Sequence, residues 1–219
     1  MKKYRSLIIS GVLLIVFIVY TILVSTVDVQ AIGPNGSSVG FASFNGKYHN
    51  KIGTDLPLYD LIDKVSLLTV PVGGIFAVVG LVQWIKRKKL LEVDSNILAL
   101  GIFYVLVFLS YLLFQIVVIN YRPVLMNEAL EASFPSSTTM LSLTLFITAI
   151  DQIFIYIEDK LLKWFLVLFD LCFCAFLVVG RILSGVHWMT DIIGGILLSS
   201  VLIFAYFGIK IFFRKKDTI

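Results

Sequence analysis

Six long apolar segments, separated by short polar or charged stretches, constrain the fold of this chain more than any other feature. A helix needs about 20 apolar residues to cross a bilayer. The predicted spans cover residues 7–25, 65–85, 97–119, 136–157, 164–180 and 192–213. Backbone polar groups inside a bilayer have no water to bind, so apolar segments of this length must be helical. The sequence therefore predicts an all-α, polytopic membrane protein, built as a six-transmembrane-helix bundle.

The composition agrees with a membrane protein rather than a water-soluble one. Hydrophobic residues make up 59% of the chain and charged residues 15%, whereas soluble domains are about 25% charged. The net charge of +4 does not indicate nucleic-acid binding, because the basic residues gather at the ends of the apolar segments. Residues 1–219 are expected to form a single membrane-embedded domain.

The distribution of basic residues predicts the orientation, because lysine and arginine accumulate on the cytoplasmic side of a membrane. With the N-terminus inside, the inner side holds 13 of the 18 basic residues. They are Lys2, Lys3, Arg5, Lys86, Arg87, Lys88, Lys89, Lys160, Lys163, Lys210, Arg214, Lys215 and Lys216. Six spans then place both termini in the cytoplasm, and the chain is expected in the cytoplasmic membrane.

Two features of the N-terminal part leave alternatives open. The first apolar segment is interpreted as a retained anchor because it is long for a signal peptide, although Val29-Gln30-Ala31 loosely resembles a cleavage site. Residues 27–64 form the longest polar stretch and are predicted to be an outer loop, in which residues 55–64 suggest a short interfacial helix. This loop is either a spacer or a flap over a site at the same face.

Polar residues from four separate parts of the chain are predicted to meet at the outer face. They stand at the end of the third span, the start of the fourth, the end of the fifth and the start of the sixth. They are Arg122, Ser136, Ser137, Thr138, Arg181, His187 and Asp191. The start of the fourth span also offers free backbone N–H groups and the positive end of a helix dipole, which suit an anion. A shared polar layer of this kind is typical of a site in a helix bundle.

The stretch from Gly180 to Asp191 carries the chemistry. His187 and Asp191 are four residues apart, so on a helix they lie on one face. A carboxylate beside an imidazole fixes its tautomer and favours its charged form, and the fork of Arg181 suits phosphate. The three residues predict a nucleophilic or acid–base histidine beside an anion clamp. The alternative is a loop whose polar residues only cap helices.

These residues resemble the type 2 phosphatidic acid phosphatase superfamily, whose motifs are Lys-x6-Arg-Pro, Pro-Ser-Gly-His and Ser-Arg-x5-His-x3-Asp. The third motif is matched by Arg181, His187 and Asp191 at the required spacing, with Gly180 in place of the serine. The family's integral-membrane members have six transmembrane helices, which agrees with the six predicted spans.

The other two motifs are half kept. The first is matched at Arg122 and the following proline, whereas the lysine position holds Gln115. The second spans residues 135–138, where Ser137 replaces the glycine and Thr138 replaces the histidine. The resemblance therefore covers roughly residues 115–191.

The resemblance implies a lipid phosphate phosphatase with its site on the extracytoplasmic face. His187 would be the nucleophile that forms a phosphohistidine, and Asp191 would orient it. The phosphate would be held by Arg122, Arg181, Ser136, Ser137 and Thr138. No metal or other cofactor is implied, because the arginines supply the positive charge. The substrate would be a lipid phosphate or diphosphate, such as an isoprenoid carrier diphosphate (undecaprenyl diphosphate is one) or a phosphatidic-acid-like lipid.

Thr138 leaves the predicted site without the family's general acid, and a positioned acid accelerates a reaction by about 10²–10⁴-fold. Glu131 or Glu128 is a candidate substitute, unless these carboxylates are simply solvated. A diphosphate lipid needs the acid less, because it expels a phosphate monoester whose second pKa is about 6. The alternative function is a non-catalytic relative that binds or transports lipid phosphates. Gln115 and Thr138 favour that alternative, and the complete third motif favours the enzyme.

Overall fold

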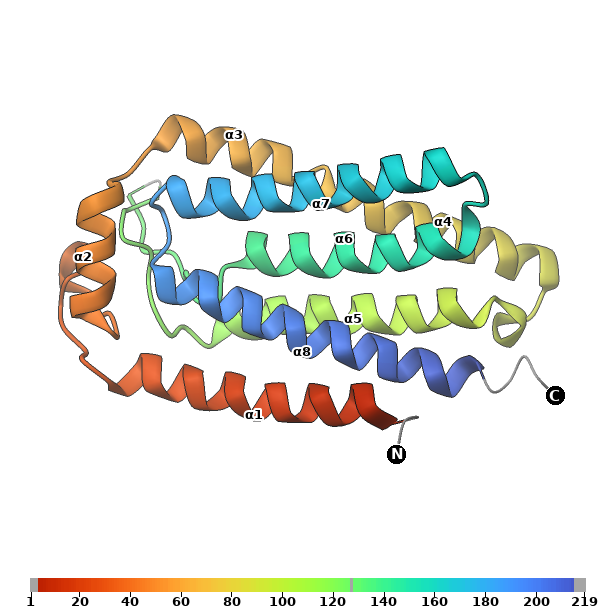
Figure 1. Ribbon diagram of the computed structural model, residues 1–219. Coiled ribbons are helices and arrows are strands. Elements are labelled where there is room, and N and C mark those ends of the chain that lie inside the picture. The colour runs from red at the N-terminus through yellow and green to blue at the C-terminus, as the bar shows by residue number, and fades with distance from the viewer. Residues whose placement is uncertain (1–3, 127, 215–219) are drawn as a thin grey trace.

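The computed structural model of the protein describes residues 4–126 and 128–214, which form helices and loops with no β-strand in these ranges (Figure 1). The helices are α1 (Arg5–Thr26), α2 (Ala42–Ile52), α3 (Leu56–Ser66), α4 (Thr69–Arg87), α5 (Ser95–Ile116), α6 (Ser137–Tyr156), α7 (Lys160–Leu183) and α8 (Met189–Arg214). Two short 3-10 helices, η2 (Pro34–Gly36) and η3 (Leu90–Glu92), lie in the connections. The all-α prediction is confirmed.

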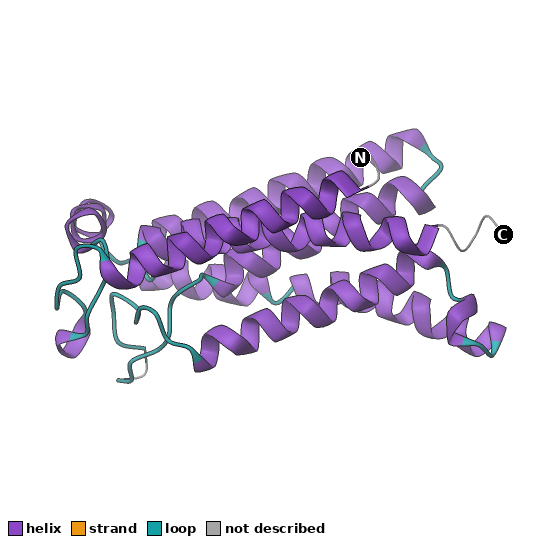
Figure 2. Ribbon diagram, turned by 90° about the horizontal axis from the view of Figure 1, so that it is seen from below, coloured by secondary structure: helices purple, strands orange, loops and turns teal. Residues whose placement is uncertain are grey.

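Six helical segments of the described chain are long and apolar enough to cross a membrane, with α3 and α4 together forming one of them. The protein is therefore a multi-pass membrane protein, as predicted. α8 packs against α1, α5 and α6, while α7 packs against α6 and α3. α1 begins and α8 ends at the end of the bundle opposite α2 (Figure 1, Figure 2).

Hydroxyl side chains allow α6 to lie in the interior of the bundle. Ser142, Thr144 and Thr148 are completely buried. Each donates to a carbonyl one turn earlier on α6, at 2.7, 2.8 and 2.7 Å respectively. Their polar groups are thus satisfied within the helix, and small side chains let the neighbouring helices approach closely.

The segment 27–64, which the sequence indicates as an outer loop, contains two helices. α2 lies across one end of the bundle, and α3 runs beside α7 (Figure 1). α3 does not stand apart from the bundle. Leu58, Ile62 and Val65 recur at helical spacing and pack on an apolar cluster that includes Leu177 of α7. This buried face draws α3 onto the bundle.

The start of α8 also differs from the sequence interpretation, which begins the sixth span at residue 192. The helix begins at Met189, so Asp191 lies in its first turn. A carboxylate there is stabilised by the positive end of the helix dipole.

Candidate functional site

The polar residues singled out in the sequence gather at the end of the bundle covered by α2. α5 and α7 end there, and α6 and α8 begin there (Figure 1). Four chain segments thus place their polar groups at the same end of the bundle.

His187 stands between α7 and α8 and is 5% exposed. Arg122 Nη1 lies 3.2 Å from His187 Nε2. Arginine has only donors, so Nε2 accepts this hydrogen bond and carries no proton. The proton of the neutral ring is then on Nδ1, which lies 3.6 Å from Asp191 Oδ2. That distance is too long for a hydrogen bond, and Nδ1 has no other hydrogen-bond partner in the described chain.

The charge state of His187 differs from the one that its neighbour Asp191 suggests. Burial lowers the pKa of His187 well below its usual value, and the positive charges of Arg122 and Arg181 lower this pKa further. A backbone interaction with Ser133 raises this pKa, but burial and the two arginines outweigh it, so the histidine is neutral at neutral pH. A neutral imidazole with an unprotonated Nε2 is the form that can attack phosphorus, and Arg122 must first release the hydrogen bond that this lone pair accepts.

Asp191 is fully buried behind His187. Its Oδ1 accepts from Asn120 Nδ2 at 3.2 Å, and its Oδ2 accepts from the Trp188 backbone N–H at 3.0 Å. Its carbonyl accepts from the Ser136 backbone N–H at 2.9 Å, which joins the start of α8 to the start of α6. Asn120 was not among the residues identified from the sequence, and only its position two residues before Arg122 could have indicated it.

The two arginines converge on one aromatic ring. The guanidinium carbons of Arg122 and Arg181 lie 5.8 and 5.0 Å from the centre of the Tyr59 ring. Arg181 is 2% exposed, and its Nη2 donates to Thr138 Oγ1 and to Asp63 Oδ1, the latter at 2.9 Å. Its Nε and Nη1 are buried and have no hydrogen-bond partner in the described part of the chain. Unpaired buried donors of a cation are costly, and an anion would satisfy them.

The three hydroxyl residues at the start of α6 differ in their contacts. Ser136 caps the helix, since its Oγ accepts from the Thr139 hydroxyl at 3.0 Å and from the Thr139 backbone N–H at 3.4 Å. Thr138 is bonded to Arg181. Ser137 lines a cavity of about 510 Å³ beside His187. Of the three, Ser137 is the one placed to meet a ligand in that cavity directly.

A family model of the PAP2 superfamily matches residues 99–215, more than half of the 219-residue chain. The chain belongs to the PAP2 superfamily. The resemblance drawn from the three short motifs is thereby confirmed. The matched residues include every position identified from those motifs.

Comparison with solved structures gives a PAP2-type relative of the same fold. The crystal structure of a transmembrane PAP2-type phosphatidylglycerolphosphate phosphatase from Bacillus subtilis matches with a TM-score of 0.58 and 18% sequence identity. The match covers 91% of this chain and 94% of that chain. At this identity the likeness establishes the fold. No curated protein matches the sequence.

The 510 Å³ cavity is lined by some of the retained and some of the altered PAP2 motif positions, and Arg181, Thr138 and Asp191 are not among its lining residues. Its walls include Gln115, Arg122, Glu131, Ser137 and His187. Gln115, which replaces the motif lysine, therefore still faces the site. Glu131 Oε2 accepts a hydrogen bond from Arg122 Nε at 3.1 Å. Sequence reasoning identified Glu131 as a candidate acid, and here it acts as an acceptor that holds Arg122.

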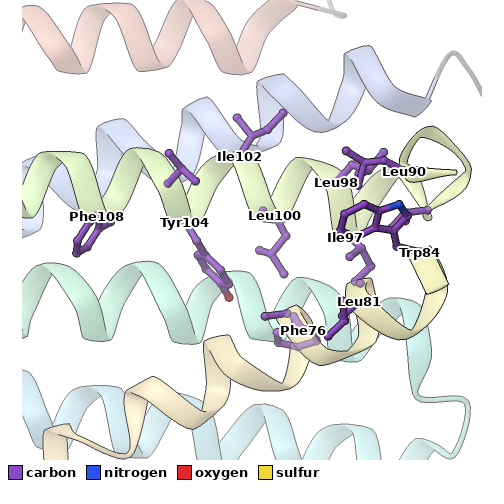
Figure 3. A pocket seen from close by; sticks show the side chains of 15 residues that line it. Phe76, Leu81, Trp84, Leu90, Ile97, Leu98, Leu100, Ile102, Tyr104 and Phe108 are labelled. Carbon is purple, nitrogen blue, oxygen red and sulfur yellow. The ribbon is translucent and has the colours of Figure 1, made fainter. Parts of the chain in front are cut away.

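A larger cavity lies elsewhere. It has a volume of about 730 Å³ between α4 and α5, and apolar side chains such as Leu81, Leu100 and Phe108 line it (Figure 3). It contains none of the predicted site residues. The described residues also contain no group of three or more His, Cys, Asp or Glu side chains that could hold a metal ion. Near His187 the positive charge comes from arginines.

Proposed function

We propose that this PAP2 protein is a membrane phosphatase that hydrolyses lipid phosphates or diphosphates through a phosphohistidine on His187. One observation carries the proposal. The unprotonated Nε2 of a buried histidine faces Arg122, next to Arg181, whose buried Nε and Nη1 have no hydrogen-bond partner among the described residues. Family membership supports phosphatase chemistry in general, and this geometry supports the nucleophile.

The first chemical step transfers the phosphoryl group to the protein. Arg122, Arg181 and Ser137 hold the phosphoryl oxygens, and His187 Nε2 attacks phosphorus while the bond to the leaving oxygen breaks. Preorganised positive groups stabilise the charge on the transferring phosphoryl group. The imidazole becomes positively charged as it forms the P–N bond, and the Asp191 carboxylate beside Nδ1 stabilises that charge.

The second step restores the protein. Water attacks the phosphohistidine, the P–N bond breaks, and inorganic phosphate leaves. The net reaction consumes one water and releases inorganic phosphate, together with the lipid monophosphate when the substrate is a diphosphate or the lipid alcohol when it is a monophosphate. No cofactor takes part in either step.

The identity of the leaving group selects the substrate class. With threonine at 138, no histidine stands there to protonate a lipid alkoxide. The proposed substrate is therefore a lipid diphosphate, such as an isoprenoid carrier diphosphate, with undecaprenyl diphosphate as one example. The Bacillus subtilis protein of the same fold is a phosphatidylglycerolphosphate phosphatase, which supports a glycerolipid monophosphate as the second substrate class.

A non-catalytic lipid-phosphate binder or transporter remains the alternative function. The observation that favours it is the bond between Thr138 and Arg181, which places a hydroxyl where the motif has a proton donor. The experiment is release of inorganic phosphate by purified protein from lipid monophosphates and diphosphates that share one lipid chain. We expect release from the diphosphate. Tight binding of both lipids without any release would assign the protein to the binder class.

We further propose that residues 1–219 act as a single membrane-embedded domain, with both termini in the cytoplasm and the site facing outward across the cytoplasmic membrane. The basic segment from Lys86 to Lys89 lies at the end of the bundle opposite α2 (Figure 1). The positive-inside rule places that segment in the cytoplasm. α2 and the site then face outward.

Cysteine labelling in intact cells tests this orientation. Lys47 on α2 and Lys88 after α4 are both exposed. In a background carrying Cys172→Ala and Cys174→Ala, we expect Lys47→Cys to react with a membrane-impermeant thiol reagent. Lys88→Cys should react only after the membrane is permeabilised. The reverse pattern would contradict the proposed orientation.

A further inference from the structure

The start of α3 is fastened to the segment that carries the third motif. The Asp55 backbone N–H donates to the Ser184 carbonyl at 3.0 Å. Gly185 has a φ of +65°, and a Cβ added there would lie 1.8 Å from the Gly53 carbonyl oxygen. Only glycine permits both this backbone conformation and this close approach. The chain before α3 therefore sits directly on the loop that leads to His187.

The middle of α3 is fastened to the same segment through Ile62, which is fully buried. A Cβ added at Gly180 would lie 2.2 Å from Ile62 Cδ1 and 2.6 Å from its Cγ1. This contact gives a physical reason for one departure from the PAP2 motif. A serine at position 180 would collide with Ile62, whereas glycine lets α3 dock beside Arg181.

The docking of α3 places two more of its side chains, Tyr59 and Asp63, against the site arginines. Tyr59 and Asp63 are four residues apart on α3 and so lie on one face. The ring of Tyr59 contacts both guanidinium groups, and Asp63 Oδ1 lies 2.9 Å from Arg181 Nη2. Neither residue belongs to a motif of the family.

One nitrogen of the Arg181 guanidinium is bonded to the protein, and the other two are buried without a partner among the described residues. Its Nη2 is used by Asp63 and Thr138, whereas Nε and Nη1 have no hydrogen-bond partner among the described residues. Arg122 is arranged similarly, with Nε held by Glu131 and Nη1 facing His187. Glu131 thus binds Nε of Arg122 and leaves Nη1 of that arginine facing His187. Asp63 binds Nη2 of Arg181 and leaves Nε and Nη1 of that arginine without a partner among the described residues. Asp63 holds Arg181 without occupying the donors that a phosphate would use.

We propose that α3 is an integral part of the phosphate clamp, and that Asp63 is a positioning residue that orients Arg181 so that its Nε and Nη1 face the phosphate. This inference rests on the proposed function, because it takes phosphate as the ligand of Arg181. It gives α3 a role in binding phosphate, so this part of the 27–64 segment is neither a spacer nor only a flap over the site.

The experiment measures binding of radiolabelled inorganic phosphate to the full-length protein in detergent micelles. All variants carry His187→Ala, so that no phosphohistidine forms and binding is measured without chemistry. We expect Asp63→Ala to weaken phosphate binding about tenfold, the scale on which partners that orient a ligand-binding side chain contribute. Asp63→Asn keeps an oxygen acceptor and should fall between the reference and Asp63→Ala. Asp60→Ala, an exposed position on the same helix, removes the same charge and should leave binding unchanged.

A second pair of variants tests the docking of α3 independently of Asp63. Gly180→Ala should displace α3 through Ile62 and weaken phosphate binding by a similar factor. Adding Ile62→Ala to Gly180→Ala removes the collision and should restore part of the binding. Thermal unfolding of each variant confirms that it is folded.

Several outcomes would overturn the inference. Tighter phosphate binding by both Asp63 variants would mean that Asp63 occupies the place of the phosphate. Unchanged binding in Asp63→Ala, or in Gly180→Ala, would reduce α3 to a spacer. No phosphate binding by the reference protein would instead contradict the proposed function itself.

Discussion

His187→Ala is expected to abolish phosphate release from lipid diphosphates while leaving their binding nearly intact. The loss should be on the order of 10⁶-fold, as for removal of other catalytic nucleophiles. The physical reason is that the variant loses the only atom that forms the P–N bond. The arginines that hold the phosphate remain. Turnover and equilibrium lipid binding are to be measured on the same reconstituted protein.

A trapping experiment adds a direct readout of the intermediate. Brief incubation with a substrate labelled in its terminal phosphate, followed by alkaline quenching, should leave label on the wild-type protein and none on His187→Ala. His49→Ala is the matched control, because His49 is the only other histidine of the chain. It should still be labelled. Equal turnover by the wild type and His187→Ala would exclude His187 as the nucleophile.

Thr138→His is expected to raise hydrolysis of lipid monophosphates by up to about 10²-fold, the lower range for a positioned general acid. Hydrolysis of lipid diphosphates should barely change, because their leaving group needs little protonation. The wild type should accordingly cleave the diphosphate much faster than the monophosphate. Both substrates must carry the same lipid chain, so that binding of the chain cancels in the comparison.

Thr138→Val provides the control for this gain. It removes the hydroxyl that accepts from Arg181 and adds no acid, so monophosphate hydrolysis should not increase. Equal rates for the two head groups in the wild type would defeat the leaving-group argument and indicate a substitute acid. Glu131, in the cavity beside His187, would then be the first carboxylate to replace, as Glu131→Gln.

Much of this picture followed from local sequence alone. The length of the apolar segments predicted a helical membrane protein, because a bilayer leaves a long apolar segment no other way to satisfy its backbone. The i, i+4 spacing of His187 and Asp191 predicted that they share a helical face. They are neighbours, with Nδ1 and Oδ2 3.6 Å apart, but His187 lies in the loop before α8 rather than on a helix. The alternation of outward and inward spans correctly predicted that Arg122, Arg181 and the start of α6 lie at the same end of the bundle. Motif spacing was sufficient to identify the superfamily that the family model confirms.

The roles of individual side chains depend on contacts between distant segments, which no local pattern encodes. The pairing of Asp63 with Arg181 joins residues 118 positions apart, and it exists because buried Ile62 draws α3 onto Gly180. The neutral state of His187 likewise comes from burial and from the positive charges of Arg181 on α7 and Arg122 in the loop after α5. Hydrophobic burial and electrostatics act through space, so the order of residues along the chain could indicate which groups meet but not which nitrogen or oxygen each of them would use.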